Sequence, residues 1–93
     1  AAQRDLDAAY LYYWQIRPAL AEEFLEELEK RLDRIREFPQ SFGVKKVVGI
    51  REAQLDTFPY IVVYRILKTG NAVAVLRIYN TFRNPARKYD RRP

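Results

Sequence analysis

The chain has 93 residues, of which 48% are hydrophobic, and we expect residues 1–93 to form a single domain with one core. It contains no cysteine and no histidine, so disulfides, thiolate metal sites and a Ser-His-Asp triad are excluded. We expect neither a metal nor another cofactor. No apolar run is long enough to span a membrane and no signal-peptide pattern opens the chain, which predicts a cytoplasmic protein.

Charge is divided unevenly along the chain. Residues 1–38 carry six basic and nine acidic side chains, a net charge of −3, whereas residues 39–93 carry eleven basic and three acidic ones, a net charge of +8. The second part can therefore present a positive surface to an anionic partner. Nucleic acid, an acidic protein segment and another subunit of an oligomer all fit this description.

Two amphipathic helices are predicted in the acidic part. Apolar residues recur at helical spacing from about Gln3 to Ile16. Pro18 ends this helix and suits the first turn of the next, which extends to about Phe38. The apolar stripe of the second helix comprises Leu20, Phe24, Leu25, Leu28, Leu32, Ile35 and Phe38. The short link between the two helices predicts an antiparallel hairpin.

Two groups of side chains on these helices have alternative interpretations. The first helix carries an aromatic run of Tyr10, Tyr12, Tyr13 and Trp14. Such a run can stack on nucleic-acid bases, but we favour its packing into the core. The glutamates of the second helix indicate a solvated face rather than catalytic carboxylates. Within this face, Glu26 with Lys30 and Glu27 with Arg31 are (i, i+4) ion pairs.

The basic part has the pattern of an antiparallel sheet. Val44–Val48 is a candidate strand or loop, and Ile50–Leu55 is a weakly alternating strand. Tyr60–Leu67 is the strongest strand pattern, and it returns through a turn at 68–71 as Ala72–Tyr79. Both strands of this hairpin are apolar on both faces, which predicts a central place in the sheet. The fold class is therefore α+β: an antiparallel two-helix hairpin packed on a twisted antiparallel β-sheet of about three strands.

Two arginines in the hairpin pose a problem of placement. A turn of even length puts Arg65 and Arg77 on opposite faces of the sheet. One of them then faces the helices, where an unpaired charge would cost on the order of several kcal/mol unless it reaches the rim. The alternation of residues does not tell which one it is.

Three segments stand out in this order along the chain: Pro18–Glu29, Phe58–Ile66 and Val75–Pro85. They resemble the second helix, the central strand, and the last strand with its closing basic segment in the ParE/RelE superfamily of toxins from bacterial type II toxin–antitoxin systems. The chain also departs from the family pattern in two ways. The sequence begins at the first helix without the usual preceding β-strand, so either the N-terminus is missing from this chain or the sheet has lost an edge strand. Asn80 stands where the family often has a histidine.

The resemblance implies a protein that halts growth when free and is neutralised by a cognate antitoxin. The ParE branch is associated with poisoning of DNA gyrase, whereas the RelE branch cleaves messenger RNA on the ribosome. RelE-like nucleases place a catalytic arginine one residue after the aromatic residue of the central strand, and Ile61 at this position favours the ParE branch. A ribonuclease using Arg65, Arg77, Arg83 and Tyr89 is a second hypothesis, and a non-toxic interaction domain is a third.

The predicted target-binding surface is a basic strip formed by Arg77, Arg83, Arg87 and Lys88. These residues follow one another along the end of the last strand and the segment after it, although a terminal charge run is often only solvated. Because the hairpin is apolar on both faces, we also expect an exposed patch where the antitoxin docks. If the sheet has lost an edge strand, its open edge is a second place for the antitoxin to pair. The assembly could be a homodimer or a toxin–antitoxin heterotetramer.

Overall fold

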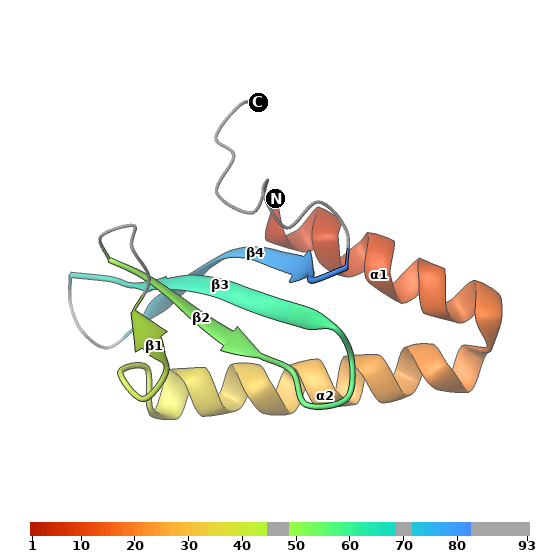
Figure 1. Cartoon of the computed structure of the whole chain (residues 1–93), viewed down its shortest axis with the longest axis horizontal. Helices are drawn as coiled ribbons and strands as arrows, with labels where there is room; N and C mark the ends of the chain where they lie inside the picture. The colour runs from red at the N-terminus through yellow and green to blue at the C-terminus, as the bar shows by residue number, and fades with distance from the viewer. Residues whose placement is uncertain (45–48, 69–71, 83–93) are drawn as a thin grey trace.

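A computed structural model describes residues 1–44, 49–68 and 72–82 of the chain. These residues form two helices followed by an antiparallel sheet (Figure 1). The elements are α1 (Ala2–Ile16), α2 (Pro18–Glu37), β1 (Gly43–Val44), β2 (Ile50–Gln54), β3 (Tyr60–Ile66) and β4 (Val73–Asn80). The predicted α+β class is confirmed, with a helical hairpin and three long strands, and β1 adds a two-residue strand beside β2. Neither helix is long and apolar enough to cross a membrane.

A proline sets the end of each helix. Arg17, the single residue between α1 and α2, is extended (φ −165°, ψ 125°) because the ring of Pro18 excludes the helical conformation from the residue before it. Pro18 occupies the start of α2, where its missing N–H would have no partner. α2 ends one residue before Phe38, whose N–H still donates to the Arg34 carbonyl at 2.8 Å, and Pro39 follows. The two predicted helices are therefore confirmed to within a few residues.

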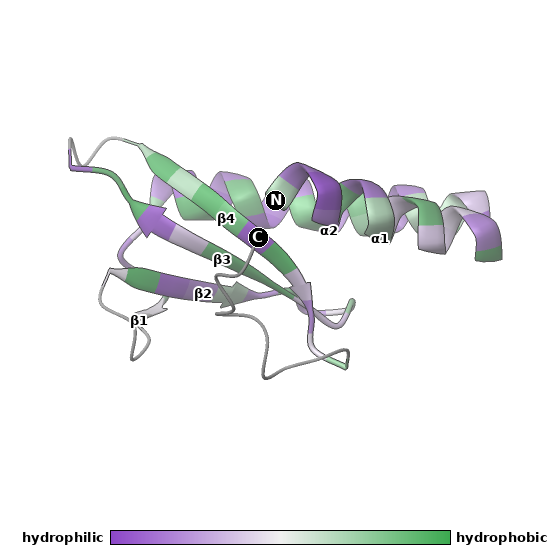
Figure 2. Ribbon diagram, turned by 90° about the horizontal axis from the view of Figure 1, so that it is seen from above, coloured by the Kyte–Doolittle hydropathy of each residue, from purple (hydrophilic) through white to green (hydrophobic). Residues whose placement is uncertain are grey.

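The helices cover one face of the sheet. The strands lie in chain order, β1-β2-β3-β4, and all neighbours are antiparallel. In Figure 2 the two helices overlap one another and the strands fan out to one side of them. Tyr60, Val62 and Tyr64 of β3 face the helices and are all buried in the common core. The alternate residues of β3 therefore point to a second face, called the open face below, which no described helix covers.

Aromatic rings dominate the core between the two layers. The ring centroid of Tyr13 in α1 lies 5.3 Å from that of Phe24 in α2 and 5.0 Å from that of Phe58. Phe24 in turn lies 5.1 Å from Tyr60 in β3. Such pairs add about 0.5–1.5 kcal/mol each beyond the area that they bury. The core interpretation of the aromatic run is thus confirmed for Tyr13, and Tyr10 is partly buried against the core. It is wrong for Tyr12 and Trp14, which are 43% and 46% exposed.

A β-bulge interrupts the pairing of β3 with β4. The register pairs Val63 with Arg77 and Tyr64 with Val75, which leaves Leu76 as an extra residue in β4. One extra residue moves every side chain beyond it to the other face of the sheet. Without the bulge, Arg77 would have been opposite a residue that faces the helices.

The bulge corrects the prediction that Arg65 and Arg77 lie on opposite faces. Arg65 is paired with Ala74, and Arg77 belongs to the same open face because its partner Val63 stands two residues from Arg65. Ile78 takes the place on the helix side instead and is only 6% exposed. The core thereby gains an apolar side chain and avoids a charge that would be costly to bury.

Candidate functional site

The predicted site residues fall into two groups. Arg65 and Arg77 belong to the described part of the chain and share the open face of the sheet. Four others lie outside the described residues: Arg83, Arg87, Lys88 and Tyr89. The structure therefore shows the start of the basic strip, up to Phe82, and the face beside it.

Arg77 is bound to the first turn of α1. Its Nε donates to Asp5 Oδ2 at 2.7 Å and its Nη2 to Asp5 Oδ1 at 3.1 Å. The same carboxylate accepts the backbone N–H of Ile78 at 2.9 Å. The side chains of Asp5 and Arg77 are 15% and 34% exposed, so this clasp is largely shielded from solvent. Hydrogen bonding to Asp5 also raises the pKa of Arg77, which keeps the guanidinium charged.

The Asp5–Arg77 clasp also protects part of a sheet edge. β4 is the last strand in the order, and no described strand pairs with its outer edge. The Ile78 N–H is satisfied there by a side chain of α1 rather than by another strand. Arg77 and Asp5 therefore connect the start of the helical hairpin to the end of the sheet, 72 residues apart in sequence.

Arg65 has a different environment. It is exposed on β3, with Ile50 of β2 and Ala74 of β4 as its cross-strand neighbours. Ile61, in the position where RelE-like nucleases have arginine, lies on the same face and is half-buried. An aliphatic side chain can neither donate a proton nor stabilise developing negative charge. In the described ranges 1–44, 49–68 and 72–82, no three acidic side chains come together as a metal-binding group.

Two residues of the open face are buried although they lie outside the core under the helices. Val63 is 2% exposed and Tyr79 is 7% exposed. The guanidinium carbon of Arg77 lies 5.9 Å from the centroid of the Tyr79 ring, within range of a cation–π interaction. The Tyr79 hydroxyl is buried and has no hydrogen-bond partner in the described part of the chain. Sequence reasoning did not single out Tyr79, because a tyrosine in an apolar strand reads as ordinary packing.

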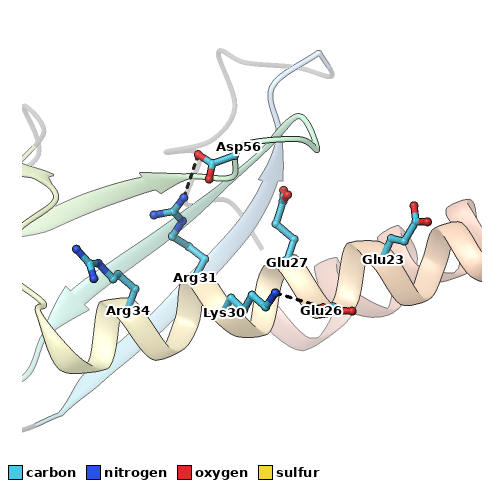
Figure 3. Close-up of a pocket in the computed structure, with 7 residues that line it drawn as sticks. All are labelled: Glu23, Glu26, Glu27, Lys30, Arg31, Arg34 and Asp56. Atoms are coloured by element: carbon cyan, nitrogen blue, oxygen red, sulfur yellow. Dashed lines mark ion pairs between the residues drawn. The ribbon is translucent and has the colours of Figure 1, made fainter.

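A polar groove of about 420 Å³ runs along α2 beside the loop that joins β2 to β3 (Figure 3). Its lining comprises Glu23, Glu26, Glu27, Lys30, Arg31, Arg34 and Asp56. The charges in it engage one another, since Lys30 Nζ lies 3.2 Å from Glu26 Oε1 and Arg31 Nη2 lies 3.1 Å from Asp56 Oδ1. The groove therefore marks the interface at which α2 contacts the β2–β3 loop.

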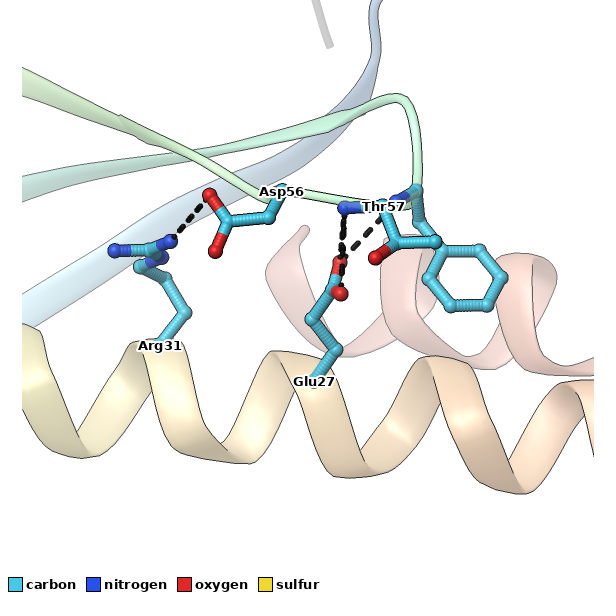
Figure 4. A network of polar contacts seen from close by, with 5 residues as sticks. Glu27, Arg31, Asp56 and Thr57 are labelled. Atoms are coloured by element: carbon cyan, nitrogen blue, oxygen red, sulfur yellow. Dashed lines mark hydrogen bonds and ion pairs between the residues drawn. The ribbon is translucent and has the colours of Figure 1, made fainter.

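Glu27 connects α2 to this loop by hydrogen bonds (Figure 4). Its Oε2 accepts the backbone N–H of Thr57 at 3.0 Å and that of Phe58 at 3.1 Å. The predicted pair of Glu27 with Arg31 is therefore replaced, because Arg31 reaches Asp56 and Glu27 reaches the loop. Partial burial by itself would raise the pKa of Glu27. The hydrogen bonds from Phe58 and Thr57 and the nearby charge of Arg31 outweigh it, so the pKa is lowered.

This lowered pKa predicts how stability depends on pH. Glu27→Gln keeps an acceptor atom but loses the charge, and we expect it to lower the free energy of unfolding at pH 7 by about 1 kcal/mol. A depressed carboxyl pKa gives stability that is present above the unfolded value, here 4.5, and is lost as pH falls through the folded value. The difference in melting temperature between wild type and variant should therefore shrink below about pH 4.5.

Glu23→Gln is the matched control. It removes a carboxylate from the same helix and the same groove, but Glu23 is exposed and does not bond the loop. We expect a change of less than about 0.5 kcal/mol at pH 7. A difference for Glu27→Gln that stays constant from pH 7 to pH 3 would show that its charge does not stabilise the loop.

The observed fold is the one implied by the ParE/RelE resemblance, which places the chain in the class of toxins from type II toxin–antitoxin systems. More specifically, residues 1–85 match the family model described as "ParE toxin of type II toxin-antitoxin system, parDE", and the chain belongs to this family. It is also similar to a solved structure described as the chromosomal ParDE toxin–antitoxin system from P. aeruginosa. The TM-score is 0.65 with 25% sequence identity, over 85% of this chain and 86% of that one. No curated protein gives a significant match.

Proposed function

We propose that this ParE-family toxin inhibits bacterial growth in the cytoplasm by binding DNA gyrase, and that a cognate antitoxin neutralises it. The observation that carries the proposal is the family match over residues 1–85. The antitoxin partner follows from membership of a toxin–antitoxin family. Gyrase follows from the ParE branch to which the resemblance of the central strand points.

The open face supports action by binding rather than by catalysis. Ile61 stands in the position where a RelE-like nuclease has a catalytic arginine. Arg77, a candidate in the nuclease hypothesis, is held by Asp5 in a bidentate pair and its charge is locally compensated. Arg65 is exposed and stands beside small or aliphatic neighbours. This arrangement suits a docking surface better than a site of general acid–base chemistry.

The surface available to an antitoxin is apolar as well as basic. On α1, Leu11, Trp14 and Ile16 are 55%, 46% and 58% exposed. The outer edge of β4 also offers backbone groups to an extended segment beyond the position that Asp5 occupies. We propose that the antitoxin lays an extended or helical segment against this apolar and basic surface. Free toxin should consequently bind an apolar dye, and its complex with the antitoxin should bind much less.

Expression of the natural full-length toxin without its antitoxin should stop bacterial growth and make the cells filamentous. Blocked gyrase prevents separation of chromosomes while cell mass continues to increase. The measurements are growth curves, cell length by microscopy and inhibition of supercoiling by purified gyrase. Co-expression of the adjacent antitoxin gene is the control and should restore growth.

Two other results would replace this proposal. An immediate arrest of translation with cut transcripts would support the ribonuclease hypothesis. Normal growth would support a non-toxic interaction domain, provided that the toxin expressed alone is folded and as abundant as the toxin co-expressed with its antitoxin.

A further inference from the structure

Phe82 is the most exposed of the large hydrophobic side chains in the described residues. It is 83% exposed, whereas the next, Ile16, is 58% exposed. A phenylalanine so exposed gains nothing for the fold, since burial of apolar area is what makes an aromatic side chain stabilising. The chain therefore presents this ring to solvent, directly after β4 and directly before the sequence Arg83–Pro93.

A hydrogen-bonded turn fixes the backbone that carries the ring. The Thr81 N–H donates to the Pro59 carbonyl at 2.8 Å, and the Thr81 hydroxyl reaches the same oxygen at 3.2 Å. The Phe82 N–H donates to Asn80 Oδ1 at 2.8 Å, an Asx turn that closes two residues of chain. Phe82 is thus an exposed apolar side chain on an ordered base rather than one on a loose end.

We infer that Phe82 is an anchor that inserts into an apolar pocket of the toxin's protein target. An aromatic ring on a preformed turn loses little conformational entropy on binding, and such residues carry much of the energy of protein interfaces. The inference rests on the proposed function, because it names the residue by which the toxin grips what it inhibits. It goes beyond the basic strip, which contributes charge but no apolar contact.

The sequence after Phe82 indicates the chemistry of the pocket rim. Residues 83–93 include five basic side chains and one acidic side chain, Asp90. An aromatic anchor followed by this excess of positive charge is complementary to an apolar pocket bordered by carboxylates. Nucleic acid is the less suitable partner, because bases stack on successive aromatic rings along a groove and the nearest aromatic on β4, Tyr79, is buried.

Asn80 is the positioning residue of this arrangement. Its side-chain oxygen accepts the Phe82 N–H, so Asn80→Ala removes the turn contact without touching the ring. Asn80→Asp keeps an acceptor oxygen at the same place. If orientation of the ring matters, Asn80→Ala should weaken inhibition and Asn80→Asp should preserve it, a difference that a purely electrostatic role of the segment would not produce.

The test compares Phe82→Ala with Phe38→Ala, which removes a second exposed phenylalanine, 46% exposed, at the C-cap of α2. Growth inhibition in cells is measured together with supercoiling by purified gyrase and thermal melting. We expect Phe82→Ala to require at least about tenfold more protein for half-inhibition, which corresponds to about 1.4 kcal/mol of binding free energy. The melting temperature should stay near the wild-type value, since an exposed side chain is removed. Phe38→Ala should inhibit like wild type.

Each other outcome overturns a separate statement. Growth inhibition by Phe82→Ala equal to that of wild type would overturn the anchor. The same result combined with loss of rescue by the antitoxin would assign Phe82 to the antitoxin instead. Loss of growth inhibition together with Phe82-dependent binding of a single-stranded oligonucleotide would replace the protein pocket by base stacking. Wild-type growth inhibition without any effect on gyrase would overturn the proposed target, and the anchor would then be judged on growth alone.

Discussion

Asp5→Ala should lower the free energy of unfolding by about 3 kcal/mol, because it removes three hydrogen bonds to one carboxylate and leaves the charge of Arg77 without its partner. The Ile78 N–H, at the outer edge of β4, would lose its acceptor as well. For a domain of this size, the melting temperature should fall by roughly 12–20 °C. Thermal or urea unfolding followed by circular dichroism measures this directly.

Asp7→Ala is the matched control for the clasp. Asp7 lies on the same turn of α1, is exposed, and accepts only the amide of Gln3, at 2.9 Å. Its loss should change stability by less than about 0.5 kcal/mol. The double variant Asp5→Ala with Arg77→Ala should lose less stability than the sum of the losses in the two single variants, because either single change already breaks the pair. Equal melting temperatures for Asp5→Ala and Asp7→Ala would show that the Asp5–Arg77 clasp does not contribute to stability.

The helices and the strands could be predicted because prolines and hydrophobic periods mark them locally. Pro18 and Pro39 fix the helix ends by steric exclusion, and the β-branched run of β3 is unambiguous. The bulge at Leu76 could not be predicted in the same way. Val73, Ala74, Val75 and Leu76 are all apolar, so no alternation in this stretch shows where one extra residue is inserted. The placement of Arg77 depends on that single residue.

The contacts that hold the site together are equally invisible in a single sequence. Asp5 meets Arg77 across 72 positions, and Glu27 meets Thr57 across 30. A carboxylate on an amphipathic helix reads as part of a solvated face, and for Glu26 that interpretation is right. Asp5 and Glu27 instead accept hydrogen bonds from backbone N–H groups that the tertiary fold brings to them, and no local sequence pattern predicts these contacts. The sequence also left open whether Arg65 faces the helices, and the structure shows that it is exposed on the open face.

The clasp changes how the basic strip has to be tested. Arg77 was predicted to contact the target, yet its guanidinium is engaged by Asp5, so a substitution there would confound loss of binding with loss of stability. Arg83 and Arg87, which follow the ordered turn at Phe82 in the sequence, are the better probes. Arg65 is also informative, because the structure places it in solvent and its reversal should not disturb the core.

Charge reversal by Arg83→Glu with Arg87→Glu should abolish growth inhibition while the melting temperature hardly changes. The double variant lowers the formal net charge from +5 to about +1 and puts two carboxylates where the target is expected to present acidic groups. Like charges at an interface slow association and oppose docking, so the inhibition of gyrase that we propose for wild type should be lost in the double variant at the same protein concentration. Growth inhibition, supercoiling assays and thermal melting of the same preparations test this.

A second double variant, Arg4→Glu with Arg17→Glu, tests whether the location of the reversed charges or the net charge alone determines toxicity. Both arginines are exposed, and the net charge falls by the same amount. Arg4 lies in the first turn of α1, where a carboxylate is compatible with the helix dipole, whereas Arg17 is both the C-cap of α1 and the N-cap of α2, so the two dipoles act on it in opposite directions. This control should remain toxic. Arg65→Glu should also fold, because its side chain is exposed on the open face. A nuclease would be favoured if Arg65→Glu folded but were not toxic, and if cells that express the wild-type toxin contained cut transcripts. Full toxicity of the Arg83 and Arg87 double variant would reduce the strip to a solvated tail and leave Phe82 as the surviving candidate for target contact.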